Sequence, residues 1–398
     1  MSSGRIRFGA LGLTVLSLIA VPAGQAAAEN ATPSTSASAS SPASPSAGAT
    51  VDKAKREVAR ALARSLSDKR WSAQVAARTR GNKAVTLQGL TPRTSTSATR
   101  SLARVISEQE RSVARAKGLS AETGPLLRLR AAGAPDAAAP SACDVLVAAA
   151  STDDHASKIT AYDAKGRAHT LDAHSAPRQA VYVVDLDTAR SRVAGMEILQ
   201  DELAKNGLAA SKSDRSKVTD SPGRSKARDS AASGDKGFWA TKIKEIQVSD
   251  VQEPWYKGEA DVFALVAGYG MDGKARVDAV DMPYLDWANT VYKPGQILVN
   301  WSNYKFNTAD VILWEDDGDI NYKALAQSLS AILLTVTDQA AFVPLAAAVI
   351  NAMPDSWWTD DPDYVESWYS LTKDSTGSLR GVSDRGSMTV EPYFVNQF

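Results

Sequence analysis

The spacing of hydrophobic and polar residues predicts helices first and strands later in this chain. From Ala54 to Leu66 an apolar residue recurs every four positions, which is the period of one helix face. A second apolar stripe runs from Leu102 to Val113 and ends before Gly118, a residue that commonly stops helices. We therefore expect residues 51–118 to be helical.

Residues 119–208 contain short apolar or alternating runs divided by turn residues, a pattern typical of strands. We expect these strands at Val145–Ala149, Ile159–Tyr162, Ala168–Leu171 and Val181–Val184. A helix fits Ser191–Asn206, with Val193, Met196, Leu199 and Leu203 on one side and Gly207 at its end. The three histidines of this unit, His155, His169 and His174, match no metal-binding spacing, so we place them on the surface.

The stretch 238–398 holds a longer series of strand patterns, separated by turns. They lie at Ile243–Val248, Ala260–Ala267, Ala275–Val280, Gln296–Trp301, Ala309–Trp314, Tyr364–Leu371 and Met388–Val395. This order favours an antiparallel β-sandwich, with a helical hairpin inserted between the fifth and sixth strands. The expected fold is α+β and multidomain, with N-terminal helices, a small middle α/β-type unit and the C-terminal sandwich.

The remaining segments have the patterns of a signal peptide, a tether and a linker. Residues 1–28 have a basic start, a short apolar centre and small residues before Glu29, which is the pattern of a signal peptide. Residues 29–50 are a Ser/Ala/Pro-rich tether and residues 209–237 a polar linker. We expect a secreted monomer without a transmembrane segment in the mature chain. Cys143 is the only cysteine, which excludes an intramolecular disulfide.

Charge is unevenly distributed although 45 basic and 45 acidic residues balance overall. Residues 51–118 hold 16 basic and 5 acidic side chains, whereas residues 239–398 hold 11 basic and 23 acidic ones. Aromatic residues are almost absent among the basic helices, so we expect no nucleic-acid partner. An alternative is that these helices act as a pro-segment on the acidic region.

Acidic residues follow three of the predicted C-terminal strands. If alternate strand ends meet at one pole, carboxylates converge there, and calcium prefers six to eight oxygen ligands. The metal ligands predicted on this basis are Asp250, Asp281, Glu315, Asp316, Asp317 and Asp319. The loop after Trp314 is similar to the third loop of C2-type sandwiches. The alternative is an acidic turn that caps the next helix through Asp319 or Asn321.

A glycine motif in the same region needs a separate interpretation. Gly268, Gly270 and Gly273 spell GxGxxG after an apolar strand. A dinucleotide site requires a helix to follow, but Lys274–Val280 alternates like a strand. We therefore predict a hairpin turn.

Four passages resemble an uncharacterised family of secreted bacterial proteins, domain of unknown function 3103. They are KITAYDAKGRAHTLDAHSAP, VDMPYLDW, QILVNWSNY and AMPDSWWTDDPDYVESWYSL. The resemblance covers roughly residues 50–398 and supports the domain order and a secreted location. It implies no activity and no catalytic residues.

The function expected from the sequence is a non-enzymatic binding or interaction protein that faces a glycan, a lipid or a cell surface. Trp255, Tyr256, Trp287, Trp357 and Trp358 fall in predicted loops and suit such contacts. The alternative for these aromatics, which we favour, is that they fill the ends of the sandwich. The alternative is an extracellular hydrolase, either a glycosidase or a metal-assisted enzyme, that uses paired carboxylates. Its candidate acids are Asp360, Asp361, Asp363 and Glu366. The sequence leaves open whether the protein is an enzyme.

Overall fold

In the computed structural model, the protein combines α-helices and β-sheets in a mixed α+β arrangement, as expected. The structure describes residues 46–81, 83–91, 96–133, 145–211, 237–249, 251, 254–336, 345–353 and 364–396. These residues form seven α-helices and three sheets within one compact unit that spans residues 45–398. The segment predicted as a signal peptide lies outside the described residues.

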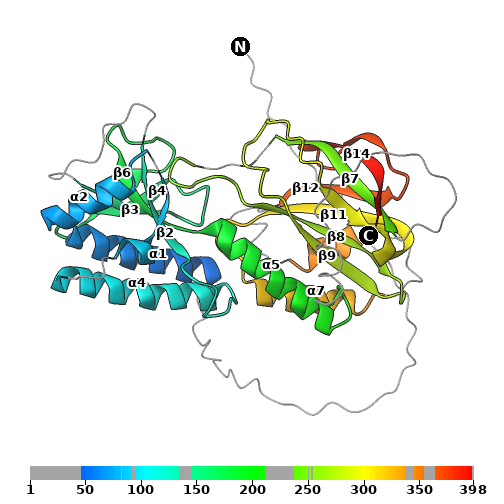
Figure 1. Ribbon diagram of the computed structural model, residues 1–398, viewed down its shortest axis with the longest axis horizontal. Coiled ribbons are helices and arrows are strands. Elements are labelled where there is room, and N and C mark those ends of the chain that lie inside the picture. The colour runs from blue at the N-terminus through cyan, green and yellow to red at the C-terminus, as the bar shows by residue number, and fades with distance from the viewer. Residues whose placement is uncertain are drawn as a thin grey trace, which may run out of the picture. The chain divides into compact units, whose positions relative to one another are not determined.

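The N-terminal helices are α1 (Ala47–Ser65), α2 (Lys69–Arg78), α3 (Leu87–Leu90) and α4 (Ser97–Ala116). Both predicted apolar stripes are buried except for Val105, which is partly buried, and α1 and α4 pack against each other (Figure 1). α1 begins inside the segment predicted as a tether, because the Ser46 hydroxyl accepts a hydrogen bond from the Ala49 amide and caps the helix.

The first sheet has six strands in the order β1-β2-β6-β3-β4-β5. Its strands are β1 (Val85–Thr86), β2 (Leu127–Ala132), β3 (Val147–Ala149), β4 (Lys158–Tyr162), β5 (Ala168–Asp172) and β6 (Val181–Leu186). Only β3 and β6 run parallel; the other neighbours are antiparallel. All four predicted strands are present, and β1 and β2 add to them. The three histidines are exposed, as predicted.

Helix α5 (Thr188–Lys205) follows the first sheet and packs against elements of the C-terminal half. Met196, Leu199 and Leu203 are buried as predicted, but Val193 is 52% exposed, because the buried stripe of α5 continues through Arg192 instead. A Cβ at Gly195 would collide with the Tyr322 ring, so glycine permits the close approach of α5 to α7 (Tyr322–Leu333).

The C-terminal half contains two four-stranded antiparallel sheets, ordered β10-β7-β14-β13 and β12-β11-β8-β9. The first is built from β7 (Gly237–Val248), β10 (Ile297–Asn300), β13 (Gly377–Arg380) and β14 (Gly386–Asn396). The second is built from β8 (Val262–Gly270), β9 (Ala275–Asp281), β11 (Tyr304–Glu315) and β12 (Tyr364–Thr372). All seven predicted strands are present, and β13 adds to them.

The sheet β12-β11-β8-β9 is buried on both faces. Phe263 and Leu265 of β8 belong to the cluster that includes α5, α7 and α8 (Ala346–Asn351). Val262 and Ala264 belong to a second cluster, together with residues of the sheet β10-β7-β14-β13. Burial on both faces explains why β8 reads as a continuous apolar run rather than an alternating one.

Two local predictions about the C-terminal half are confirmed. Asn321 caps α7 by accepting a hydrogen bond from the Ala324 amide. β8 and β9 form an antiparallel hairpin through the glycine motif, in which Gly273 has a φ of 78°. A helix also occupies part of the second predicted insertion helix, at α8. None of the described helices combines the length and hydrophobicity that a bilayer span needs.

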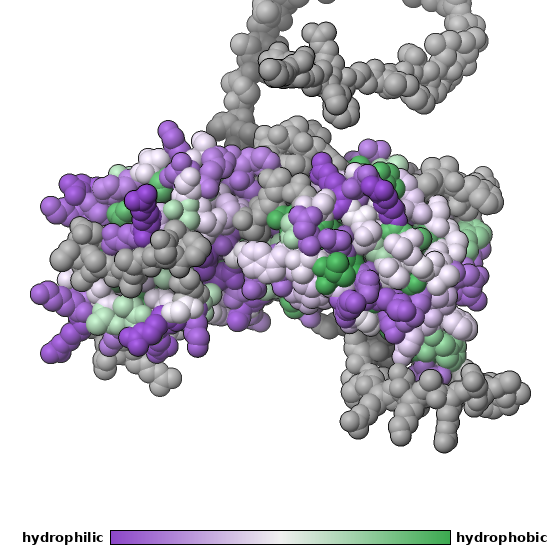
Figure 2. Space-filling model, turned by 90° about the horizontal axis from the view of Figure 1, so that it is seen from above, coloured by the Kyte–Doolittle hydropathy of each residue, from purple (hydrophilic) through white to green (hydrophobic). Residues whose placement is uncertain are grey.

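Hydrophobic residues on the visible surface are scattered. On the face drawn in Figure 2, they occur as separate patches among hydrophilic and intermediate residues. Single exposed apolar residues are ordinary on protein surfaces, so a candidate site must be identified from side-chain geometry.

Candidate functional site

The predicted metal ligands Asp281 and Glu315 lie at the end of their strands, on either side of the start of β8. Asp281 is opposite Phe263 in the β9–β8 pair, and Glu315 is opposite Val262 in the β11–β8 pair. The structure thus brings the ends of β9 and β11 together on either side of the first residues of β8. Asp250 lies outside the described residues.

Asp316 is held by a lysine and a tyrosine. Both Asp316 and Lys117 have fully buried side chains, and Lys117 Nζ lies 3.0 and 3.2 Å from the two carboxylate oxygens. The Tyr322 hydroxyl donates a 2.6 Å hydrogen bond to the same carboxylate. Burial, and then the negative charge of Asp316, raise the pKa of Tyr322 well above its ordinary value. Lys117 thus neutralises this aspartate.

Asp317 shares a second lysine with a residue of the first half of the chain. Lys257 Nζ lies 2.8 Å from Asp317 Oδ1 and also pairs with Asp154. Glu315 is buried beside this group, and its pKa is raised well above the ordinary value by burial and by the negative charges of Asp317 and Asp154. Burial and the two neighbouring carboxylates therefore both favour the neutral form of the Glu315 side chain.

Arg192 of α5 neutralises a third acidic group, which consists of Asp261 and Asp281. Its Nε lies 2.6 Å from Asp281 Oδ1, and its Nη1 pairs with Asp261. Burial outweighs the attraction of Arg192 and raises the pKa of Asp261 to about 6. Because Arg192 itself is 2% exposed, this group joins α5 firmly to the ends of β8 and β9.

These lysine and arginine pairs occupy the positions where the sequence suggested a cation. Within the described ranges, no group of three or more His, Cys, Asp or Glu side chains could hold a metal ion. Asp319 is half-buried, with its Cβ close to Gly48 of α1. The calcium site stays a prediction.

The segment Trp255–Lys257 contacts the first sheet on the face opposite α1. Tyr256 is fully buried in the cluster formed by that face, and its hydroxyl donates a 3.1 Å hydrogen bond to the Asp153 carbonyl. Trp255 Nε1 donates a 3.2 Å hydrogen bond to the Asp172 carbonyl. Trp255 and Tyr256, two of the aromatic residues predicted in loops, thus make contacts within the protein.

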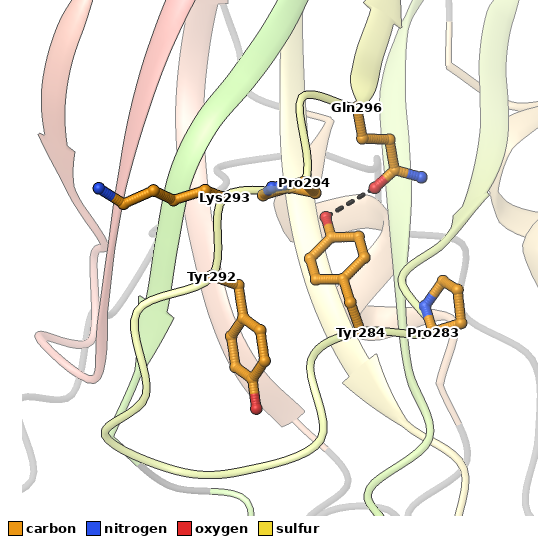
Figure 3. Close-up of a pocket in the computed structure, with 6 residues that line it drawn as sticks. All are labelled: Pro283, Tyr284, Tyr292, Lys293, Pro294 and Gln296. Carbon is orange, nitrogen blue, oxygen red and sulfur yellow. Dashed lines mark hydrogen bonds between the residues drawn. The ribbon is translucent and has the colours of Figure 1, made fainter.

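An open groove of about 470 Å³ lies on the loop between β9 and β10. It is lined by Pro283, Tyr284, Tyr292, Lys293, Pro294 and Gln296, and we call it the tyrosine groove (Figure 3). The rings of Tyr284 and Tyr292 are half-buried, with centroids 6.0 Å apart and a 50° angle between their planes. Trp287 belongs to the same loop and is 54% exposed.

Hydrogen bonds fix both tyrosine rings. The Tyr284 hydroxyl donates a 2.6 Å hydrogen bond to Gln296 Oε1 (Figure 3). Gln296 Nε2 in turn donates a hydrogen bond to the Asp281 carbonyl. The Tyr292 hydroxyl accepts a 2.9 Å hydrogen bond from the Trp287 amide. Burial, and then the negative charge of Asp281, raise the pKa of Tyr284, so the phenol stays neutral. The hydroxyls of both rings are thus already hydrogen-bonded within the protein.

The acids suggested for a hydrolase do not form a described catalytic pair. Asp360, Asp361 and Asp363 lie outside the described residues, together with Trp357 and Trp358. Glu366 is fully buried and accepts hydrogen bonds from the Ser383 amide and hydroxyl and from the Arg385 amide. This carboxylate organises a loop.

The sequence does not predict the three buried cations that neutralise these acidic groups, Lys117, Lys257 and Arg192. Isolated basic residues are ordinarily solvated, and Lys117 lies 199 positions from its partner Asp316 in the sequence. The tyrosine groove had a local signal, because VDMPYLDW was already a distinctive passage.

Comparison with curated proteins and with solved structures gave no match. The model of a family described as protein of unknown function (DUF3103) matches residues 55–398, which confirms the resemblance seen in the four sequence passages. The chain belongs to this family.

Proposed function

We propose that this protein is an extracellular, non-enzymatic binding protein whose tyrosine groove binds the sugar rings of a glycan. The observation that carries the proposal is the pair of half-buried tyrosines whose hydroxyls are already bonded inside the protein. Rigid aromatic faces bind the apolar faces of sugar rings at little entropic cost. Lys293 and Gln296 add polar groups at the rim.

The lining of the groove favours binding over hydrolysis. Glycosidases need two carboxyl groups that flank the scissile bond. None of the six residues that line the tyrosine groove is acidic. A hydrolase that uses the acids near Trp357 remains the second candidate, and turnover distinguishes the two.

The finer features of the proposal rest on separate observations. The N-terminal basic and apolar pattern supports secretion. The shared cluster of Val262, Ala264 and residues of β7, β10 and β14 supports a β-sandwich as the scaffold of the groove. The calcium loop expected from the Glu315–Asp319 passage predicts a rise in Tm with calcium, whereas neutralisation of Asp316 and Asp317 by Lys117 and Lys257 predicts none.

Affinity electrophoresis of the mature chain in gels that contain single polysaccharides tests the proposal. We expect Tyr292→Ala to weaken binding, because loss of one stacking ring costs about 1 kcal/mol, or about fivefold in Kd. Tyr369→Ala is the matched control, since Tyr369 is an exposed tyrosine on β12. Equal effects of the two substitutions would contradict a site at Tyr292.

A turnover assay runs on the same polysaccharides. We expect no new reducing ends after prolonged incubation with the wild-type protein. Reducing ends that appear with wild type and disappear on substitution of a single acid would replace the binding hypothesis by the hydrolase.

A further inference from the structure

A second groove, of about 390 Å³, lies where β7, β13 and β14 meet. Every residue that lines it is polar or glycine: Gln247, Ser249, Asn289, Ser378, Arg380, Asp384, Arg385, Gly386 and Ser387. We call it the arginine groove. Ser387 is opposite Gln247 on one side and Arg380 on the other, so these side chains share one face of the sheet. The absence of apolar lining among these residues indicates a hydrophilic ligand.

The turn that carries the two arginines is rigidly held. Glu366 accepts hydrogen bonds of 2.7–2.9 Å from Ser383 and from the Arg385 amide. The Arg385 carbonyl accepts hydrogen bonds from the amide and the hydroxyl of Ser249. Asp384 has a φ of 66°, a conformation that a non-glycine residue keeps only when its surroundings fix it. The site is therefore built before a ligand binds.

The side chains of this turn remain available at the surface. Arg380 pairs with Asp384 at the rim, and both side chains are mostly exposed. Arg385 is exposed, and its guanidinium forms no ion pair with any residue that the structure describes. A planar guanidinium next to serine and amide groups is suited to carboxylate or sulfate oxygens.

The arginine groove and the tyrosine groove belong to one surface. Asn289 lines the former and Tyr292 the latter, on the same loop. Tyr292 forms an isolated antiparallel β-bridge with Ile246 of β7, and Lys293 forms a 2.9 Å ion pair with Glu245. Glu245 and Gln247 are two residues apart on β7, so they point to the same face. A chain-like ligand on the tyrosines could thus extend to the arginines.

We propose that the ligand is an acidic polysaccharide, whose carboxylate or sulfate groups bind in the arginine groove while its sugar rings lie on Tyr284 and Tyr292. This inference rests on the proposed glycan-binding function. It adds the chemical class of the ligand, which the tyrosine groove alone does not define.

The test compares three polymers in affinity gels with the mature chain: dextran, dextran sulfate and polygalacturonate. Dextran and dextran sulfate share a backbone and differ in charge, and polygalacturonate separates carboxylate from sulfate. We expect at least one anionic polymer to bind about tenfold more tightly than dextran, and Arg385→Gln to remove that preference. Arg380→Gln should act in the same direction. Because the loop contacts of Arg385 use its backbone, Arg385→Gln should fold normally.

The control must address the basic helices, since polyanions could bind there. Arg111→Gln changes an exposed arginine of α4 and should leave the preference intact. The inference would be overturned if Arg111→Gln abolished the preference for polyanions over dextran and Arg385→Gln did not. It would also be overturned if the wild-type protein bound neither polyanion more tightly than dextran. In both cases, binding that Tyr292→Ala still weakens would leave the proposed function standing. Loss in Arg385→Gln without any effect of Tyr292→Ala would instead support the arginine groove and reject the tyrosine groove.

Discussion

Two loop regions at the same ends of the C-terminal strands differ in burial. The acidic loop after β11 is buried, and lysines from distant parts of the chain neutralise Asp316 and Asp317. The loops after β9 and β13 stay at the surface, and their polar groups are tethered by neighbouring residues. Clustered charge alone therefore does not identify a binding site. Exposed polar groups on a well-held backbone are a better indicator of a binding site, because they remain accessible to a ligand.

Removing a buried cation should produce the largest effect. Lys257→Met leaves Asp154 and Asp317 buried without their cation, and breaking such a pair costs about 3–5 kcal/mol. Urea unfolding at neutral pH measures the loss. The matched control is Lys244→Met, because Lys244 pairs with Glu391 at the surface and should cost less than about 1 kcal/mol. Similar losses in both variants would remove the distinction between the two regions.

The pH dependence of stability should show a second, smaller effect of burial. The pKa of Asp261 is about 6 in the folded protein, against an ordinary value of 3.8. Between these values the folded state holds a proton that the unfolded chain has released, so stability decreases as pH rises through the window. We expect this contribution to decrease by about 2–3 kcal/mol between about pH 4 and 6.

Asp261→Asn isolates that contribution, since an asparagine has no proton to release. The free energy of unfolding of wild type minus that of the variant should decrease as pH rises from about 4 to 6, in urea titrations at both ends. A difference that is constant over this window would show that Asp261 titrates normally.

Calcium should have the smallest effect on stability. Lys117 and Lys257 already neutralise Asp316 and Asp317, so we expect the same Tm in EDTA and in millimolar calcium. A ligand present at 100 times its Kd would add about 2.7 kcal/mol. A rise of that size would establish the calcium site that the sequence predicts, and would move the acidic loop into the class of binding sites.

The sequence predicts the elements of the fold better than the partners of the site. Strands such as β8 and helices such as α1 follow from apolar spacing, which is a local property. The short strand β13 was missed because Gly377 and Ser378 resemble a turn. The acidic loop was recognised as a cluster, but its counter-ions could not be, since Lys117 and Lys257 come from segments whose approach depends on the whole fold.

The site at the surface shows the same limit. The sequence predicts both Tyr256 and Trp287 in loops, but Trp287 is exposed in the structure whereas Tyr256 is buried. Both have the same local pattern of an aromatic among turn residues and acids. Only tertiary packing decides which one covers a sheet and which one faces water.

The docking of Tyr256 on the first sheet affects how the protein loses its structure. The first half of the chain supplies the face that Tyr256 covers, and α5 supplies the cation for Asp261 and Asp281. Neither half can open alone without exposing an aromatic surface and an unpaired charge. Hydrogen exchange should therefore give the same free energy of opening for the amides of β3 and of β8, because both open in one cooperative global unfolding reaction.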